Sequence, residues 1–312
     1  MATTTSITTS YAGEFAGKYI SAALLSGETL NNGGVEIKPN VKFKEVIKKV
    51  STDAILKDAT CGFEPTSTLT LTERILQPEE FQVNLELCKK DFRSDWEAIQ
   101  MGYSTFDQLP PSFADFLIGH VSAKVAQKIE TNIWGGVDTN PGEFDGLTVL
   151  MAADGDVNDA VTTETSFTAA NIVTELGKLV DAIPNSVLYQ DDLHIYVPNN
   201  VYQLYLRALG GFQSGGVGAN GYENKGNNQA IGSLMFDGIK IFRAPGMPAD
   251  HMVAAQKSNL FFGTGLLSDL NEVKVIDMGD LDGSQNVRVV MRATAGVQYG
   301  IGSDVALYTL AS

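Results

Sequence analysis

The chain has little cysteine and histidine, and both shortages narrow what it can do. Its 312 residues include two cysteines, Cys61 and Cys88, and three histidines. Two cysteines are too few for a disulfide framework, and neither has another cysteine or a histidine nearby at metal-ligand spacing. We therefore expect a reducing compartment and no metal site built on thiols.

Positive charge is also scarce, with 22 basic residues against 37 acidic ones and a formal net charge of -15. A surface of this sign repels nucleic acid as a whole, so specific readout of DNA or RNA is not expected. The one dense basic run, Lys42 to Lys49 (KFKEVIKK), is more typical of a solvated face than of a phosphate-binding one.

Long apolar runs are missing as well. No 18 consecutive apolar residues occur, and the first residues (MATTTSITTSYAGEF) show no basic segment followed by an apolar core. We expect neither a membrane span nor a secretion signal.

Glycine, in contrast, is plentiful, with 31 residues. The stretch GVGANG, Gly216 to Gly221, matches the dinucleotide-binding pattern G-x-G-x-x-G. That pattern needs a strand before it, a helix after it and an acidic residue about twenty positions further on. Here the end of a helix precedes it, and YENKGNNQAIG follows without helical periodicity. We expect a loop, no cofactor and no enzyme activity, although a reaction centre scattered over the sequence stays open.

Two other patterns suggest metal sites, and both are weak. Asp154, Asp156 and Asn158 begin like a calcium-binding EF-hand loop, but Asp159 stands at position six and Thr165 at position twelve. The histidines His120, His194 and His251 are far apart in the sequence, so structural roles are more typical of them. No metal ligand is assigned.

Two segments with alternating apolar and polar residues, 68–76 (TLTLTERIL) and 81–88 (FQVNLELC), predict strands with one wet face. Pro65 and Pro78 interrupt them, which favours a projecting ribbon over a central sheet. Such a ribbon needs a partner to cover it. The candidate interface residues are Phe63, Leu69, Leu71, Ile75, Phe81, Val83 and Leu85.

Helical periodicity is strongest between residues 110 and 134. Apolar residues recur there every four positions from Phe113 to Ile133, and Gly135 and Gly136 stop the run, which predicts a helix of about 23 residues and about 35 Å. Further helices are expected at 11–25 and 168–182. A strand turns into a helix at Pro198, and the last eighty residues are rich in strands. The fold class is therefore α+β.

Four segments carry a resemblance to a known family. They are NIWGGVDTNPGEFDGL (132–147), HIYVPNNVYQLYLRAL (194–209), FDGIKIFRAPGMPADHMVAAQKSNLFFG (236–263) and NVRVVMRATAGVQYGIGSDVALYTL (286–310). Together with their order they resemble the Hong Kong 97-type (HK97-fold) major capsid protein of tailed bacteriophages. In the first segment, the family has a glycine-rich turn and a Gly-Leu pair that opens a strand.

The resemblance implies an organisation for the whole chain. Residues 1–50 would form an N-terminal arm, 51–90 an extended E-loop hairpin, and 91–164 a peripheral domain with the spine helix 110–134. Residues 165–268 would form the axial domain, and 269–312 would return to the peripheral domain. Gly215, Gly216, Gly218 and Gly221 would then lie in an axial loop, where glycines let one sequence fit five-fold and six-fold surroundings.

The resemblance also implies a function. The chain would self-assemble through pentamers and hexamers into an icosahedral virion shell that encloses double-stranded DNA without binding it specifically. Assembly would take place in the host cytoplasm with a separate scaffolding protein and a portal, and a decoration protein is a further candidate partner. Glu73 or Arg74 occupies the neighbourhood of the family's crosslinking lysine, so crosslinking is not carried over. The alternatives are an encapsulin-like compartment and a dinucleotide-dependent enzyme that uses residues 216–221.

Overall fold

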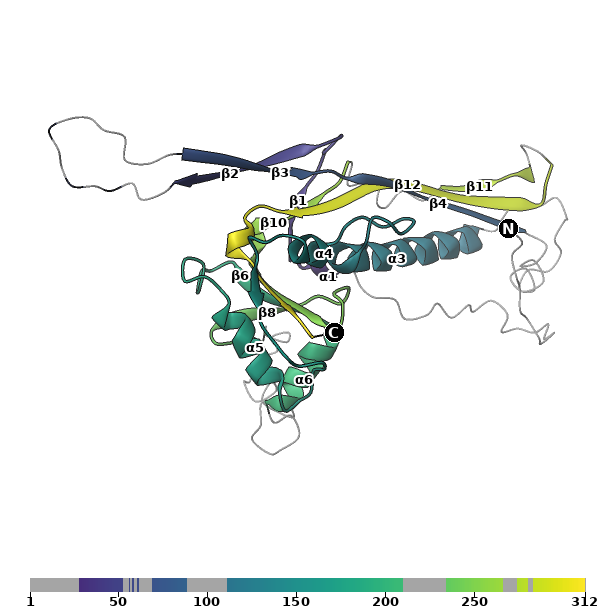
Figure 1. The fold of residues 1–312 in the computed structure, drawn as a ribbon. Coiled ribbons are helices and arrows are strands. Elements are labelled where there is room, and N and C mark those ends of the chain that lie inside the picture. Colours follow the sequence, from purple (N-terminus) through teal and green to yellow (C-terminus); the bar gives the residue numbers. More distant parts are fainter. Residues whose placement is uncertain are drawn as a thin grey trace, which may run out of the picture.

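The computed structural model describes residues 28–52, 69–88, 111–209, 234–265, 274–279 and 283–311, together with Leu56, Asp58 and Cys61. Helices and sheets are mixed, as the α+β expectation requires. Long strands form an upper layer over one long helix, a two-stranded ribbon projects from one end of this layer, and a separate lobe hangs below (Figure 1). Among the described residues, no helix is both long and apolar enough to span a bilayer.

The upper layer is one sheet, and the long helix α3 (Pro111–Gly135) packs beneath it. The sheet has the order β1-β10-β12-β11, and β4 also pairs with β12. Its strands are β1 (Glu36–Lys38), β4 (Glu79–Cys88), β10 (Leu260–Gly263), β11 (Lys274–Asp277) and β12 (Asn286–Tyr299). Leu117 and Val121 of α3 pack against Val289 of β12, and Ile129 and Ile133 are also buried. From Leu117 to Ile133 the four-residue apolar repeat is therefore packed into the core of this layer, and the predicted helix matches α3 within one residue at each end.

The lower lobe is built on a six-stranded sheet with the order β5-β13-β9-β6-β8-β7. The strands are β5 (Asn158–Ala160), β6 (Leu193–Val197), β7 (Met235–Phe236), β8 (Ile239–Arg243), β9 (His251–Gln256) and β13 (Ala306–Thr309). The helices α5 (Ile172–Asp181) and α6 (Asn199–Ala208) cover one face, and β6 turns into α6 at Pro198, as the sequence predicts. The other face meets the core around α3, so β9 buries Met252 and Ala254 on one side and Val253 and Ala255 on the other.

The ribbon consists of β2 (Glu45–Thr52) and β3 (Leu69–Leu76) in antiparallel register. The sequence led us to expect a ribbon of residues 68–76 and 81–88, but β4 pairs with β12. Period-two alternation identifies a strand without naming its partner. The break at Gln77 and Pro78 separates the ribbon from the sheet, so the two predicted strands lie in different sheets.

A second difference concerns the segment after α3, where the resemblance predicts a strand opened by Gly146 and Leu147. The structure has the helix α4 (Leu147–Ala152) there. Leu147 and Met151, four positions apart, are both fully buried in the same core as Trp134. A Cβ atom on Gly146 would lie 2.5 Å from the Trp134 carbonyl oxygen, so glycine permits this close turn. Spacing by four selects a helix over a strand.

The strands of the two sheets also do not follow the expected domain ranges. The strand β10 falls within 165–268 but belongs to the upper sheet, and β13 falls within 269–312 but belongs to the six-stranded sheet. Within the expected arm, the short helix α1 (Glu28–Asn31) and β1 pack on the body. The helix expected at 11–25 lies outside the described residues. Sheets join strands that are distant in sequence, so contiguous ranges describe them only roughly.

Candidate interaction surfaces

One face of the ribbon is apolar and exposed. Leu69, Leu71 and Ile75 are 63%, 64% and 44% exposed, and in the adjacent strand Val46 and Val50 are 44% and 57% exposed. Val46 is paired with Ile75 and Val50 with Leu71 across the antiparallel register, so these side chains share one face. We call Val46, Val50, Leu69, Leu71 and Ile75 the ribbon face. Three of them are sequence candidates.

The sequence candidates missed Val46 and Val50, because the segment KFKEVIKK was interpreted from its charges. The alternation of Val46, Lys48 and Val50 was the signal that could have revealed this strand. Lys48 and Glu73 stand opposite each other within the ribbon face, so the face also carries one residue of each charge.

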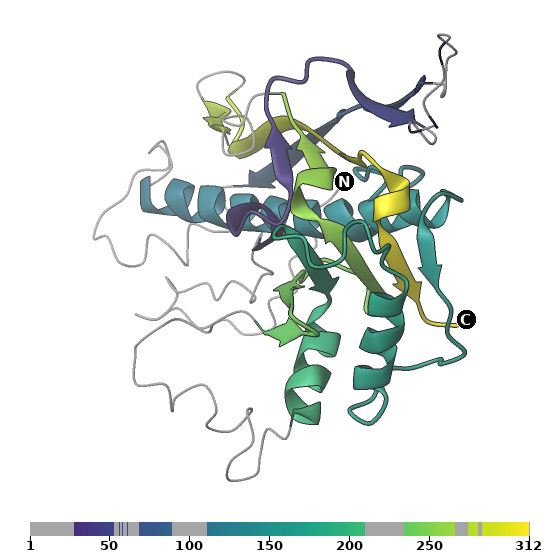
Figure 2. The same cartoon turned by 90° about the vertical axis from the view of Figure 1, so that its left-hand side faces the viewer.

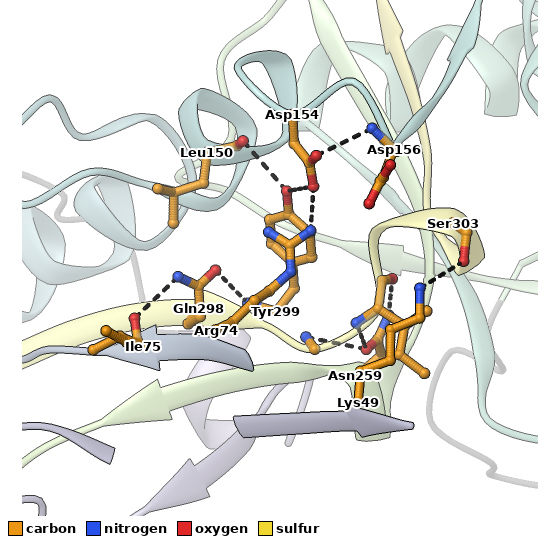
Figure 3. Close-up of polar contacts among 12 residues, drawn as sticks. Lys49, Arg74, Ile75, Leu150, Asp154, Asp156, Asn259, Gln298, Tyr299 and Ser303 are labelled. Carbon is orange, nitrogen blue, oxygen red and sulfur yellow. Dashed lines mark hydrogen bonds and ion pairs between the residues drawn. The ribbon is translucent and has the colours of Figure 1, made fainter. Parts of the chain in front are cut away.

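The opposite face of the ribbon contacts the body of the chain. Lys49 donates from Nζ to Ser303 Oγ at 3.4 Å, and a methyl group built on Gly300 would lie 3.6 Å from Ile47. Arg74 points the same way (Figure 3). Since side chains alternate between the two faces of a strand, the ribbon face must point away from its own chain.

The candidates on β4 have different surroundings. Phe81 and Val83 are half-buried against the chain's own cores, whereas Leu85 is 43% exposed. The structure therefore separates the sequence candidates into two groups. Leu69, Leu71 and Ile75 lie together on the ribbon. Phe81, Val83 and Leu85 lie apart from them on β4. Phe63 and the glycines Gly215, Gly216, Gly218 and Gly221 lie outside the described residues.

Where the ribbon meets the body, Arg74, Asp154 and Tyr299 form a polar cluster that we call the ribbon root (Figure 3). Asp154 Oδ2 accepts hydrogen bonds from the Arg74 guanidinium and, at 2.7 Å, from the Tyr299 hydroxyl. The Arg74 guanidinium also lies 4.3 Å from the centroid of the Tyr299 ring, within the range of a cation–π contact. Gln298 Nε2 donates to the Ile75 carbonyl at 3.1 Å.

The electrostatics of the ribbon root favour its charged form. Burial acts to raise the pKa of Asp154, but hydrogen bonds from Tyr299, the Asp156 amide and Arg74 bring that pKa below its ordinary value. Burial together with the hydrogen bond to Asp154 raises the pKa of Tyr299, which therefore stays a neutral donor. The root is a charge-assisted clamp between β3, β12 and the loop after α4.

Hydrogen bonds within the chain occupy Asp154 and Asn158 of the acidic loop that resembles the start of an EF-hand. Asp154 Oδ1 accepts from the Asp156 amide at 3.1 Å, and Asn158 donates to the carbonyl groups of Ser303 and Val305. Within the described ranges, no three His, Cys, Asp or Glu side chains are grouped so that they could hold a metal ion. His194 and His251 lie on two strands, and each places Nδ1 2.7 Å from an oxygen atom, of Asp192 and Asp250 respectively.

A buried carboxylate attaches the segment before β1 to α3. Glu130 is 1% exposed, and its Oε2 accepts from the Thr29 amide at 3.1 Å. The Trp134 indole donates to Thr29 Oγ1 at 2.9 Å. Burial raises the pKa of Glu130, against the effect of the hydrogen bonds from Thr29. Residues 28–38 are therefore part of the body and not a free arm.

No protein-family model matches the sequence, and no curated protein matches it either. Solved structures do match, over nearly the whole chain. The capsid of the native GTA particle has a TM-score of 0.63 and 14% identity over 94% of this chain and 93% of that chain. The capsid of Myoviridae phage XM1 has a TM-score of 0.59 and 13% identity over 94% and 95% of the two chains.

A third match is the procapsid of satellite phage P4 that includes the size determination protein, with a TM-score of 0.51 and 13% identity over 90% of this chain and 96% of that chain. At identities this low, the likeness establishes the fold. The chain has the fold of phage capsid proteins, which confirms the resemblance to the Hong Kong 97-type family.

Proposed function

We propose that this chain is the major capsid protein of a tailed bacteriophage. It assembles through pentamers and hexamers into an icosahedral shell that encloses a double-stranded DNA genome. The ribbon face carries the proposal: in a chain with a capsid fold, five apolar side chains point away from the body on a strand pair with no core of its own. The chain acts by assembly and not as an enzyme, and it needs no cofactor.

The parts of the fold support this assignment. The β2–β3 ribbon serves as the E-loop, α3 as the spine helix, and the upper sheet with α3 as the peripheral domain. The six-stranded sheet with α5 and α6 serves as the axial domain, with the glycine-rich segment 215–221 at the capsomer axis. Residues before α1 serve as the N-terminal arm, which α1 and β1 attach to the body.

The ribbon face gives the assembly a driving force. Burying an exposed Val, Leu or Ile side chain fully stabilises by about 1.5–3 kcal/mol. These five are about half exposed, so covering them is worth roughly 5 kcal/mol per copy, before the cost of association. Order in the ribbon and contact with a neighbouring copy are thereby coupled.

The surroundings of the shell follow from the same proposal. The net charge of -15 keeps the chain from binding packaged DNA tightly. A separate scaffolding protein sets the size of the shell, and the structural likeness to a procapsid that includes a size determination protein supports testing for one. A portal and a decoration protein are further partners, and the finished chain resides in the virion after assembly in the host cytoplasm.

The proposal is tested by electron microscopy of the purified full chain, alone and co-expressed with candidate scaffolding proteins from the same genome. We expect closed icosahedral shells. The variant Leu71→Asp places a charge on the ribbon face and should lower the yield of shells more than tenfold. Thr70→Asp is the matched control, since it puts the same charge one residue away on the opposite face.

Leu71 is 64% exposed, so Leu71→Asp should keep the melting temperature of the unassembled chain. A wild-type chain that stays a monomer or dimer with every partner would refute the proposal. Equal shell yields from Leu71→Asp and Thr70→Asp would show that the ribbon face does not drive assembly. The contents of the particles distinguish a virion from an encapsulin-like compartment. Nuclease-protected double-stranded DNA would support the virion, whereas a protein cargo would contradict it.

A further inference from the structure

The two edges of the six-stranded sheet carry exposed side chains that complement each other. The sheet begins at β5 and ends at β7, and in Figure 2 β5 lies on the right and the β7–β8 hairpin on the left. Six strands have five gaps between them, so these edges are about 24 Å apart. One copy cannot bring its own two edges into contact.

The β7 edge presents an apolar patch beside a positive charge. Met235 is 51% exposed and pairs directly with Lys240 across the β7–β8 hairpin, so both exposed side chains project from one face. Tyr189 is 66% exposed and covers the turn of this hairpin, since a methyl group built on Gly238 would lie 3.8 Å from its ring. We call Tyr189, Met235 and Lys240 the β7 patch.

Tyr189 is held in an unfavourable backbone conformation. Its φ angle is 62°, in the left-handed region that side chains as bulky as tyrosine rarely adopt. The ring gains little burial in return, because it is mostly exposed. Strain of this kind persists where a position has a function that the isolated fold does not explain.

The β5 edge presents an exposed apolar side chain beside a negative charge. Val161 is 83% exposed, and Asp159 is exposed in β5 between half-buried Asn158 and buried Ala160. Ala160 points into the core beneath α5, so Asp159 points to the opposite face of the sheet. We call Asp159 and Val161 the β5 patch.

The two charges lie on the same side of the sheet. Ile239 and Ile241 point into the core that α5 and α6 cover, so Lys240 between them points away from these helices, as Asp159 does. A second copy can therefore place its Asp159 opposite Lys240 without being turned over. Val161 then meets Met235 and Tyr189.

We infer that copies of this chain join head to tail through these edges, the β7 patch of one copy contacting the β5 patch of the next. The inference rests on the proposed function and names the contact that builds its capsomers. A contact between two different patches repeats from copy to copy, and it closes at a rotation of about 60° into a six-membered ring or about 72° into a five-membered one. Patches this small, with one charge pair at their margin, tolerate both rotations.

Charge reversal in the full chain tests the contact, under the conditions in which the wild-type chain assembles. Lys240→Glu and Asp159→Lys should each raise the concentration needed for rings or shells about tenfold, because each places like charges together. The double variant should return to within about threefold of the wild-type chain. Lys124→Glu on α3 is the matched control for surface charge and should leave assembly unchanged.

Tyr189→Gly separates this role from a structural one. Glycine suits a φ of 62°, so the unassembled variant should melt at the wild-type temperature or above it. Its assembly should still require about a tenfold higher concentration. If either single charge reversal leaves the assembly concentration at the wild-type value, this contact is refuted. The same holds if the double variant assembles worse than both single variants. Neither result would affect the proposed function. A wild-type chain that forms no rings at all would overturn the proposed function instead.

Discussion

The variant Arg74→Met removes the charge of the ribbon root and keeps an apolar side chain of similar length. Arg74 loses its charge-assisted bond to Asp154 and its stacking on Tyr299. A hydrogen bond between charged groups contributes about 1.5–3 kcal/mol and an exposed cation–π contact about 0.5–1 kcal/mol. The side chains of Arg74 and Asp154 are 26% and 19% exposed, so water compensates for part of the lost interaction energy. The net loss of stability is then about 2 kcal/mol.

The loss should be local, because the root joins the ribbon to the body and the six-stranded sheet has its own core. Hydrogen exchange of the unassembled chain, read by mass spectrometry, measures it. A cost of about 2 kcal/mol corresponds to exchange about 30-fold faster in the peptide that contains residues 74–76. Peptides from β6 and β9 should exchange as in the wild-type chain.

Lys49→Met provides the matched control. It removes a positive charge from the same face of the ribbon, but its partner Ser303 is neutral and 3.4 Å away. We expect its exchange to change less than threefold. Equal effects of the two variants, or a loss spread evenly over both sheets, would refute the idea that the ribbon root fixes the ribbon.

Segments with strong local patterns could be predicted from the sequence. The repeat from Leu117 to Ile133 has one side chain per turn facing the sheet, and Gly135 and Gly136 end the run, so α3 was predicted with nearly correct bounds. Pro198 marks the change from β6 to α6 because proline suits the entry to a helix and not a strand interior. Both signals lie within a few residues of the structure that they determine.

The partners of the strands and the ribbon root could not be predicted in this way. Arg74 and Asp154 are 80 residues apart, and Tyr299 is 145 residues beyond Asp154. No spacing rule connects them, and in the sequence Arg74 was considered only because it lies near the position of the family's crosslinking lysine. Strand β9 also lacked a pattern, since both of its faces are buried and HMVAAQ shows no alternation.

The candidate interface was only partly predictable for a related reason. Alternation shows which side chains share a face, but it does not show which face the chain itself covers. Leu71 and Val83 have the same local pattern, and they differ because α3 packs beneath β4 and nothing in the described chain covers the ribbon face. That distinction depends on tertiary contacts with α3, which is remote in sequence.

Three further predictions concern packing, thiol access and pH. Gly246→Ala should destabilise the fold by about 3 kcal/mol in urea unfolding, because its Cβ would lie 2.1 Å from the Glu130 carbonyl oxygen, whereas Gly155→Ala, with open space around it, should be neutral. In the unassembled chain, Ellman's reagent should label exposed Cys61 faster than half-buried Cys88, and equal rates would contradict the structure. The pH prediction follows from Asp154, whose pKa in the folded chain lies below its ordinary value of 3.8. A carboxylate with a lowered pKa contributes stability that is fully present above the unfolded value and is lost as the pH falls through the folded value. The stability difference between the wild-type chain and Asp154→Asn should therefore be constant from pH 7 to about pH 5 and shrink below about pH 4. Other carboxylates titrate in both chains and cancel in this difference, so a gap in urea midpoints that stays constant down to the acid limit would show that the charge of Asp154 does not stabilise the ribbon root.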